Sequence, residues 1–325
     1  MEQSSLLIPE VKSRKKRRDV HAGDRRFFWT LRAVALLILA VLIAIAVQLF
    51  LVSLPAIRHF GVGFVFSTDW NPVRNRFGAA AFVYGTVVSS VLAIAIAFPI
   101  SLGVALFLNE LAPRRLASAV GFLVEMLAAI PSVVYGLWGL FVVAPWLRTV
   151  FEPMMIRYFG FIPLFQGPPY GVGMFTAGVV LAIMITPTIS AISREIFRAV
   201  PLSHREAALA LGATRWETIR LGVLNSSRLG ILGAVILGLG RALGETMAVT
   251  MVIGNRKDIA LSLFAPAQTM ASLLANEYAE ASDDLHLSAL ATVGFLLFLV
   301  SFLINSLARF LVWRVESRQK EGAPR

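Results

Sequence analysis

Long apolar runs alternate with short polar segments along most of this chain. A helix that crosses a bilayer needs about 20 largely apolar residues, and six runs meet that requirement. The pattern therefore predicts an all-α, polytopic membrane protein with six transmembrane helices. We expect these helices at Ala33–Leu54, Ala80–Phe107, Ala119–Trp146, Gly171–Ser193, Leu229–Ile253 and His286–Ala308.

The predicted spans divide the chain into a tail, a single first helix, a core and a second tail. Residues 1–32 form a basic tail, and 33–54 form the first helix. Residues 77–309 contain the other five spans and form the predicted core domain, followed by a tail at 310–325. Proline within a helix removes a backbone hydrogen bond, so we expect kinks at Pro99, Pro131 and Pro187.

Composition excludes several classes of protein. Hydrophobic residues make up 57% of the chain and charged residues only 15%, whereas soluble domains carry about 25% charge. The net charge of +11 is also found in nucleic-acid binders, but here the basic residues cluster in tails and loops, so no nucleic acid is expected. Cysteine is absent and the four histidines are scattered, so we expect no metal site and no cofactor in this chain.

The basic residues also predict the orientation of the spans. With the N-terminus inside, the tails and inner loops hold 22 of the 30 lysines and arginines and the outer loops hold 7. Positive charge is retained on the cytoplasmic side of a membrane, so both ends are expected in the cytoplasm. The basic run from Lys12 to Arg18 is expected to contact anionic membrane lipid.

The inner segment 200–225 between the fourth and fifth spans, called the coupling loop below, predicts two short helices. The first is rich in alanine and leucine, and Gly212 suits its C-terminal end. Capping boxes, in which a hydroxyl and a carboxylate each accept a backbone N–H, are predicted at Ser203 with Glu206 and at Thr214 with Glu217. Such a loop fits a groove on a partner, although an ordinary amphipathic loop would have a similar composition.

Three ionisable residues fall inside predicted spans, where charge is costly and often functional. They are Glu125, Arg241 and Glu245. Arg241 and Glu245 are four residues apart, so on one helix they would share a face, near the middle of the membrane, with Gly240 and Gly244 beside them. Two interpretations remain open: an ion pair that holds helices together, or a site where Arg241 binds a tetrahedral oxyanion.

Glu245 conflicts with an oxyanion site at Arg241, because a carboxylate repels an anion. Two hypotheses resolve this. Glu245 pairs with Arg241 when no substrate is present, or it accepts a hydrogen bond from a protonated oxyanion. Phosphate carries such a proton near neutral pH and sulfate does not. Glu125 is expected to serve helix packing or the pore.

Within the coupling loop, Glu206, Ala207, Ala208 and, after a gap, Gly212 resemble the EAA loop of binding-protein-dependent ABC importer permeases. The resemblance implies that this loop docks on an ATPase subunit. The pattern departs further on, where the family has I-x-L-P and this chain has Gly222, Val223, Leu224 and Asn225. No lysine follows a glycine, so the chain lacks a P-loop, is not expected to be an enzyme, and leaves ATP hydrolysis to a separate chain.

Three longer stretches are similar to the PstC-type permeases of phosphate-specific ABC importers. They are GLGRALGETMAVTMVIGN at 238–255, AAIPSVVYGLWGLF at 128–141 and ANEYAEA at 275–281. The resemblance implies a type I importer permease (MetI-like) core and inward transport of inorganic phosphate across a bacterial plasma membrane. It implies that Arg241 and Glu245 take part in translocation. It also implies a PstA-type sister permease, two PstB-type ATPase subunits and an external PstS-type binding protein.

Two alternatives remain. The same architecture could import another oxyanion, such as molybdate, sulfate or phosphonate. A secondary transporter or a channel would need no ATPase, but such transporters usually contain inverted repeats, and no convincing repeat is found here.

Overall fold

The computed structural model describes residues 20–321, so the basic run from Lys12 to Arg18 lies outside the described residues. The chain divides into two compact units, Met1–Gln48 and Leu49–Arg325. Helix α1 (Val20–Phe60) begins in the first unit and ends in the second. It is longer at both ends than the predicted span Ala33–Leu54. Its part in the first unit exposes nearly all of its described apolar side chains, as expected for a helix that lies in lipid or against another chain.

Within residues 20–321, six helical segments are long and apolar enough to cross a membrane, which confirms the predicted number and the all-α class. Their bounds are Phe27–Phe60, Ala80–Leu111, Ser132–Phe159, Met174–Arg198, Arg215–Gly244 and Asp284–Arg314.

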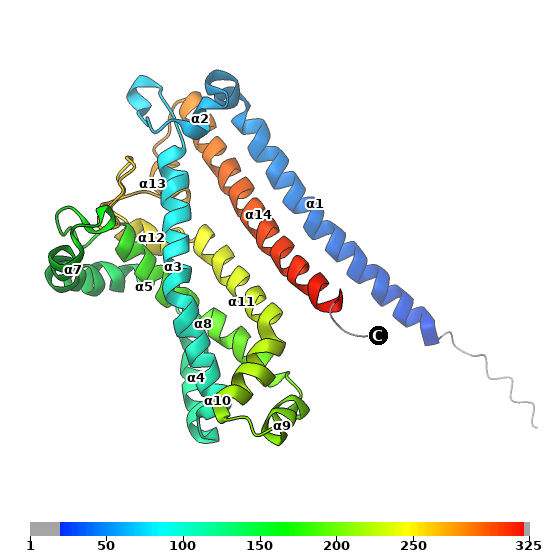
Figure 1. The fold of residues 1–325 in the computed structure, drawn as a ribbon. Helices are drawn as coiled ribbons and strands as arrows, with labels where there is room; N and C mark the ends of the chain where they lie inside the picture. Colours follow the sequence, from blue (N-terminus) through cyan, green and yellow to red (C-terminus); the bar gives the residue numbers. More distant parts are fainter. Residues whose placement is uncertain (1–19, 322–325) are drawn as a thin grey trace, which may run out of the picture. The chain divides into compact units, whose positions relative to one another are not determined.

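Among the described residues, the second unit contains five longer helices and several short ones (Figure 1). The longer helices are α3 (Ala80–Leu106), α4 (Arg114–Ala128), α8 (Met174–Arg198), α11 (Asn225–Gly244) and α14 (Asp284–Glu321). Shorter α-helices are α2 (Gly63–Phe66), α5 (Ser132–Trp138), α6 (Ala144–Trp146), α7 (Glu152–Phe159), α9 (Leu202–Ala210), α10 (Arg215–Thr218), α12 (Met247–Val252) and α13 (Met270–Glu277). The π-helical segments are η2 (Phe107–Leu111), η3 (Gly139–Val143), η4 (Leu147–Phe151) and η6 (Ile219–Leu224), and the 3₁₀ turns are η1 (Pro72–Arg74) and η5 (Pro163–Phe165).

The core forms where α3 packs along α8, with α5, α11 and α12 around them. Small residues allow the close approach. A side chain at Gly178 of α8 would meet that of Leu92 in α3 at 2.5 Å. The hydroxyl of Ser101 in α3 donates to the carbonyl oxygen of Thr186 in α8, 3.2 Å away. Close packing of small residues and hydrogen bonds between helices are the usual means of joining helices in membranes.

A second core lies where the end of α1 meets α14. The hydroxyl of Ser288 in α14 donates to the carbonyl oxygen of Val52 (2.8 Å) and accepts from the backbone N–H of Ala56 (2.9 Å). In a regular helix that N–H would bond the same carbonyl directly. The neighbouring Pro55 lies inside α1 and lacks an N–H. The Ser288 hydroxyl is therefore inserted into the hydrogen-bond ladder of α1 and joins the two helices.

The third predicted span, Ala119–Trp146, is wrong as a single helix. Helix α4 ends at Ala128, and α5 begins only at Ser132 with Pro131 as its N-cap. Proline disfavours helical geometry at the residue before it and cannot continue the ladder of bonds. The apolar segment that follows is instead continuous to Phe159. At the other end of the chain, the predicted tail 310–325 is helical as far as Glu321.

Candidate functional site

The fifth span is interrupted, and the uninterrupted helix predicted at Leu229–Ile253 is wrong. Helix α11 ends at Gly244, and Glu245 has extended backbone angles (φ −70°, ψ 128°). A new helix, α12, begins at Met247. Backbone that leaves the helix inside a spanning segment is tolerated where it is buried in protein or lines a water-filled cavity. Broken helices of this kind form the substrate sites of many transporters.

Arg241 lies in the last turn of α11, directly before the break. Its side chain is half-buried, and its Nη1 donates to the hydroxyl of Thr188 in α8, 3.2 Å away. Among residues 20–321, no ion pair joins Arg241 to a carboxylate. The C-terminal end of a helix carries partial negative charge, which stabilises a cation there. The guanidinium is thus held by the fold, while most of its donors have no acceptor among the residues that the structure describes.

The prediction that Glu245 and Arg241 share one helix face is wrong. Because α11 ends at Gly244, the four-residue spacing no longer puts the two side chains on one helix face. The Glu245 carboxylate instead accepts the backbone N–H of Ala248, with Oε1 3.3 Å from the nitrogen. Glu245, which precedes the N-cap residue Thr246, therefore accepts a backbone N–H in the first turn of α12. The interpretation of a self-neutralising pair does not describe this arrangement, nor does the hypothesis that Glu245 pairs with Arg241.

The glycines near Arg241 differ in their surroundings. A side chain at Gly238 would meet Ile189 of α8 at 2.7 Å, so α11 and α8 are in close contact. At Gly240 the nearest atom is the Asn305 amide oxygen of α14, at 3.7 Å. A side chain at Gly244 would meet nothing within 4 Å. Gly240 therefore faces a neighbouring helix, whereas Gly244, beside the break, faces open space.

Helix α12 is fixed in place by contact with α5, which begins after Pro131. A side chain at Gly136 of α5 would meet the Cα of Ala248 at 2.9 Å. One turn on, a side chain at Gly139 would meet Val180 of α8 at 2.7 Å and Val252 at 3.0 Å. The glycines of the 128–141 stretch thus let α5 pack closely on α12 and hold the break beside α8.

Glu125 lies apart from this site, in α4, and outside the span Ser132–Phe159. Its carboxylate is 3.9 Å from Nη1 of Arg194 in α8, but 66% of the Glu125 side chain is exposed. An ion pair this long, with one partner mostly in solvent, contributes little stability. Arg194 is itself buried and donates to the carbonyl oxygen of Ala117, 3.2 Å away. Glu125 therefore lies at a contact between α4 and α8.

The coupling loop forms two helices, α9 and α10, at the opposite end of α3 from α2 and α13 (Figure 1). Gly212 has a φ of +81°, which glycine adopts without strain and which ends α9 as predicted. The capping box of Thr214 and Glu217 is confirmed. The one at Ser203 is wrong: α9 already begins at Leu202, so Ser203 lies within the first turn and makes no cap hydrogen bond.

The surface of the coupling loop is unusually apolar. Glu206 and Ala207 are exposed and Ala208 is half-buried. Beside them, large apolar side chains are exposed at Leu209 (54%), Leu211 (90%) and Trp216 (60%). Exposed apolar clusters of this kind mark surfaces that bind another protein.

The departure from the I-x-L-P pattern coincides with a close contact between α9 and η6. A side chain at Gly222 would lie 3.1 Å from the carbonyl oxygen of His204. The His204 ring also lies 3.0 Å from the hydroxyl of Ser226, measured from Nδ1. Glycine at 222 therefore lets the first helix of the loop pack directly on the segment that leads into α11.

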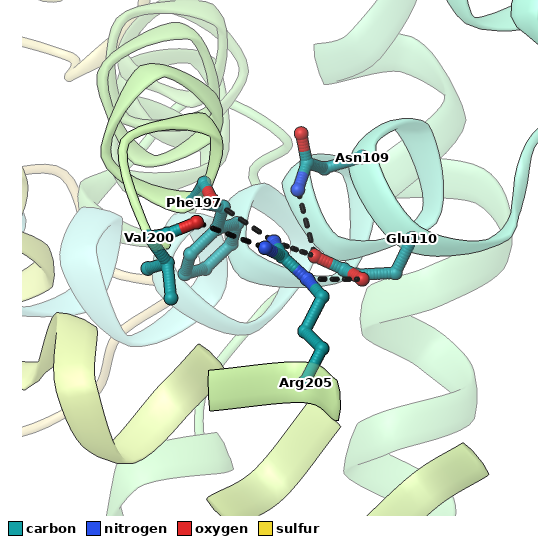
Figure 2. A network of polar contacts seen from close by, with 5 residues as sticks. All are labelled: Asn109, Glu110, Phe197, Val200 and Arg205. Carbon is teal, nitrogen blue, oxygen red and sulfur yellow. Dashed lines mark hydrogen bonds and ion pairs between the residues drawn. The ribbon is translucent and has the colours of Figure 1, made fainter. Parts of the chain in front are cut away.

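A largely buried ion pair between the coupling loop and η2 was not predicted from the sequence. Arg205 of α9 and Glu110 of η2 lie 2.8 Å apart, with 17% and 12% of their side chains exposed (Figure 2). Arg205 directly precedes the Glu206 motif, but no local spacing connects it with Glu110, 95 residues earlier.

A second missed cluster surrounds Glu277, within the ANEYAEA stretch. Its carboxylate accepts from Lys257 Nζ (2.6 Å) and Trp70 Nε1 (2.8 Å) and lies 3.2 Å from Nε2 of His286. Burial raises the pKa of Glu277, but the hydrogen bonds and the Lys257 charge outweigh burial and leave the pKa below its usual value. The cluster borders a polar cavity of about 510 Å³. It joins α13 to α14 and to the segments that precede α3 and α13.

Comparison with known proteins identifies the architecture. Residues 95–317 match the family described as binding-protein-dependent transport system inner membrane component. The chain belongs to this family. It is 49% identical to the phosphate transport system permease protein PstC of Mesorhizobium japonicum over 91% of each chain. It is 44% identical to the PstC of Pasteurella multocida, over 98% of this chain and 99% of the relative. The resemblance to PstC-type permeases is thereby confirmed.

Solved structures agree on the fold. The bacterial alginate ABC transporter, solved with its alginate-bound periplasmic protein, contains a chain that superimposes with a TM-score of 0.61. That match is 17% identical and covers 90% of this chain and 97% of the other. A chain of the inward-facing MetNI methionine ABC transporter superimposes with a TM-score of 0.53 at 19% identity, over 72% and 94% of the two chains. The chain thus has the type I ABC importer permease fold.

Proposed function

We propose that this chain is the membrane-spanning permease subunit of an ABC importer that moves inorganic phosphate into the cell. Curated relatives that cover nearly the whole chain are named phosphate transport permeases. The chain itself carries out no covalent chemistry. ATP is hydrolysed by a separate partner chain, for which the coupling loop is the docking element.

The observation that carries the proposal is the guanidinium of Arg241 at the break between α11 and α12, which forms no ion pair with any carboxylate in the described part of the chain. Three features of its surroundings favour an oxyanion. Within residues 20–321 its one hydrogen-bond acceptor is the neutral hydroxyl of Thr188, the chain beside it is unwound, and Gly244 leaves open space. A planar fork of N–H donors matches two oxygens of a tetrahedral oxyanion. Arg241 is therefore proposed to bind phosphate during passage.

Glu245 supports phosphate over a fully deprotonated oxyanion. Its carboxylate lies at the helix break, directly after Gly244, and accepts the backbone N–H of Ala248. A carboxylate beside an anion is unfavourable unless a proton lies between them. Phosphate supplies that proton near neutral pH, so Glu245 is proposed to accept a hydrogen bond from protonated phosphate and to disfavour sulfate.

The proposed partners are inferred from the exposed surface of the coupling loop and from the likeness to PstC-type permeases. The apolar side chains of Leu209, Leu211 and Trp216 beside Glu206 support docking to an ATPase subunit. We propose two such PstB-type subunits, a PstA-type sister permease and an external PstS-type phosphate-binding protein. The location is a bacterial plasma membrane with both termini cytoplasmic, which the distribution of basic residues supports.

The mechanism is alternating access. ATP binding closes the ATPase dimer and moves α9, and the helices around the break switch between outward- and inward-facing states. The binding protein delivers the anion on the external side, and Arg241 holds it in the membrane until the inner side opens.

The test is transport by the complete complex in proteoliposomes. Purified permeases and ATPase are reconstituted, the binding protein is added outside, and uptake of radiolabelled phosphate is measured with and without ATP. We expect uptake to require ATP and to be abolished by Arg241→Ala. Excess sulfate or molybdate should not inhibit it. Uptake that persists without ATP would contradict an ABC importer. Stronger competition by sulfate or molybdate than by unlabelled phosphate would assign the same architecture to that oxyanion.

A further inference from the structure

The Arg205 guanidinium joins the ends of three helical elements (Figure 2). It extends from α9 to the Glu110 carboxylate at the end of η2, with Nη2 2.8 Å from Oε1 and Nε 3.3 Å from Oε2. It also donates to the carbonyl oxygens of Phe197 (3.1 Å) and Val200 (2.9 Å), at the end of α8. Asn109 donates to the same carboxylate, 2.7 Å away.

This pair is more than a surface contact, because both charges are largely withdrawn from water. With 17% and 12% of their side chains exposed, each depends on the other for compensation of its charge. Breaking such a pair by removing one partner is strongly unfavourable, since the remaining charge stays buried and unpaired. The Arg205 donors are also well used, because two backbone carbonyls accept the hydrogen bonds that the carboxylate does not. The arrangement is therefore rigid.

The two sides of α9 have different surroundings. Glu206 and Ala207 are exposed on the coupling loop, whereas Arg205, the adjacent residue, is half-buried against the ends of α3 and α8. The backbone of α9 itself packs on η6, which leads into α11. The Arg205 side chain thus extends the contacts of α9 to the other two core helices.

Helix α8 connects this pair with the candidate anion site. Phe197, whose carbonyl accepts from Arg205, lies nine residues beyond Thr188, which accepts from Arg241. At 1.5 Å per residue these points are about 14 Å apart along one continuous helix. Packed helices move as stiff bodies. A displacement of α9 therefore reaches the Arg241 site through Arg205 and α8.

We propose that Glu110 and Arg205 form a clamp that transmits movement of the coupling loop to α3 and α8, and so couples ATP hydrolysis to anion transport. This inference rests on the proposed function. Both are positioning residues: neither touches the anion, and Arg205 faces away from the exposed side of the coupling loop. Loss of the clamp should leave the ATPase bound and active, but less anion should be transported for each ATP hydrolysed.

The experiment measures phosphate transported per ATP hydrolysed by the complete complex in proteoliposomes. The variants are Glu110→Gln, Arg205→Gln and the two combined. The control is the Glu195→Gln/Arg198→Gln variant, which removes a 2.8 Å ion pair that is exposed and lies within one turn of α8. We expect each single variant to lower the ratio by about fivefold or more, as for a lost coupling between sites. The double variant should be no worse than the worse single variant, and the control should be unchanged.

Assembly is measured in parallel by co-purification of the ATPase. An unchanged ratio, or transport and ATPase rates that fall together, would overturn the clamp and leave a purely structural pair. If the Gln variants fail to assemble, Arg205→Lys decides the question. It keeps the charge but loses the planar fork, and it should assemble with a reduced ratio; a normal ratio would also overturn the proposal. A wild-type complex that transports a different oxyanion would refute the phosphate assignment alone, and the ratio is then measured with that anion.

Discussion

The Arg241 guanidinium donates to the Thr188 hydroxyl in α8, 3.2 Å away, and not to Glu245 four residues further along the chain. This contact orients the cation with a neutral acceptor. A carboxylate partner would have cancelled the charge that an anion needs. The helix break at Glu245 is the cause, because it turns the carboxylate toward the backbone of α12.

Replacing Thr188 with valine should weaken the site without abolishing it. The substitution removes the hydroxyl that orients Arg241, and a hydrogen bond to a charged group is worth about 1.5 kcal/mol or more, so the concentration for half-maximal phosphate uptake should rise about tenfold. Thr186→Val is the matched control, since the Thr186 hydroxyl bonds only its own helix, at the Ala182 carbonyl. Equal effects of the two substitutions would show that the Thr188 hydroxyl has no special role.

Replacing Leu211 with glutamate should weaken binding of the ATPase subunit. This side chain is 90% exposed beside Gly212, so the folded chain loses no packing, while burial of a charge in a docking groove is costly. We expect the amount of co-purified ATPase to fall about tenfold or more with unchanged thermal stability of the permease. Val73→Glu, at a 95% exposed position in η1, is the control and should retain the ATPase. Retention by the Leu211 variant as well would place the docking surface elsewhere.

Replacing Ser288 with alanine should destabilise the second core. The variant leaves the Val52 carbonyl and the Ala56 N–H without the hydroxyl that bridges them. An unsatisfied buried polar group costs about 1–3 kcal/mol, which should appear as a lower midpoint in thermal unfolding of the detergent-solubilised protein. Ser282→Ala, at an exposed position, should leave the midpoint unchanged. An unchanged midpoint for the Ser288 variant would mean that the Ala56 N–H bonds the Val52 carbonyl directly once the hydroxyl is removed.

The cluster around Glu277 should make stability depend on acid pH. Because the pKa of Glu277 is lowered in the folded state, its carboxylate stabilises the fold at pH above the pKa of the unfolded state. That contribution should be lost as the pH falls through the lower, folded-state pKa. Thermal unfolding of the wild type should therefore show a drop in this acidic range that Glu277→Gln lacks. Identical pH profiles for the two proteins would contradict this assignment.

The sequence by itself determined the features that depend on neighbouring residues. Six apolar runs of sufficient length fixed the number of spanning helices, because a bilayer requires backbone hydrogen bonds to be satisfied within each segment. Gly212 and the Thr214–Glu217 box marked the end of α9 and the start of α10, because capping is local chemistry. The motif around Glu206 and the stretch around Arg241 indicated the family, because both are continuous runs of residues that can be read without knowing the fold.

Only the tertiary structure decided which polar groups meet. Arg241 and Thr188 are 53 residues apart, and Arg205 and Glu110 are 95 apart. No periodicity along one helix reveals such pairs, because they depend on which faces of separate helices pack together. The break at Glu245 was missed for a related reason. Hydropathy records that a segment is apolar, whereas the end of a helix depends on glycines, caps and neighbours such as α5 that stabilise the interrupted backbone.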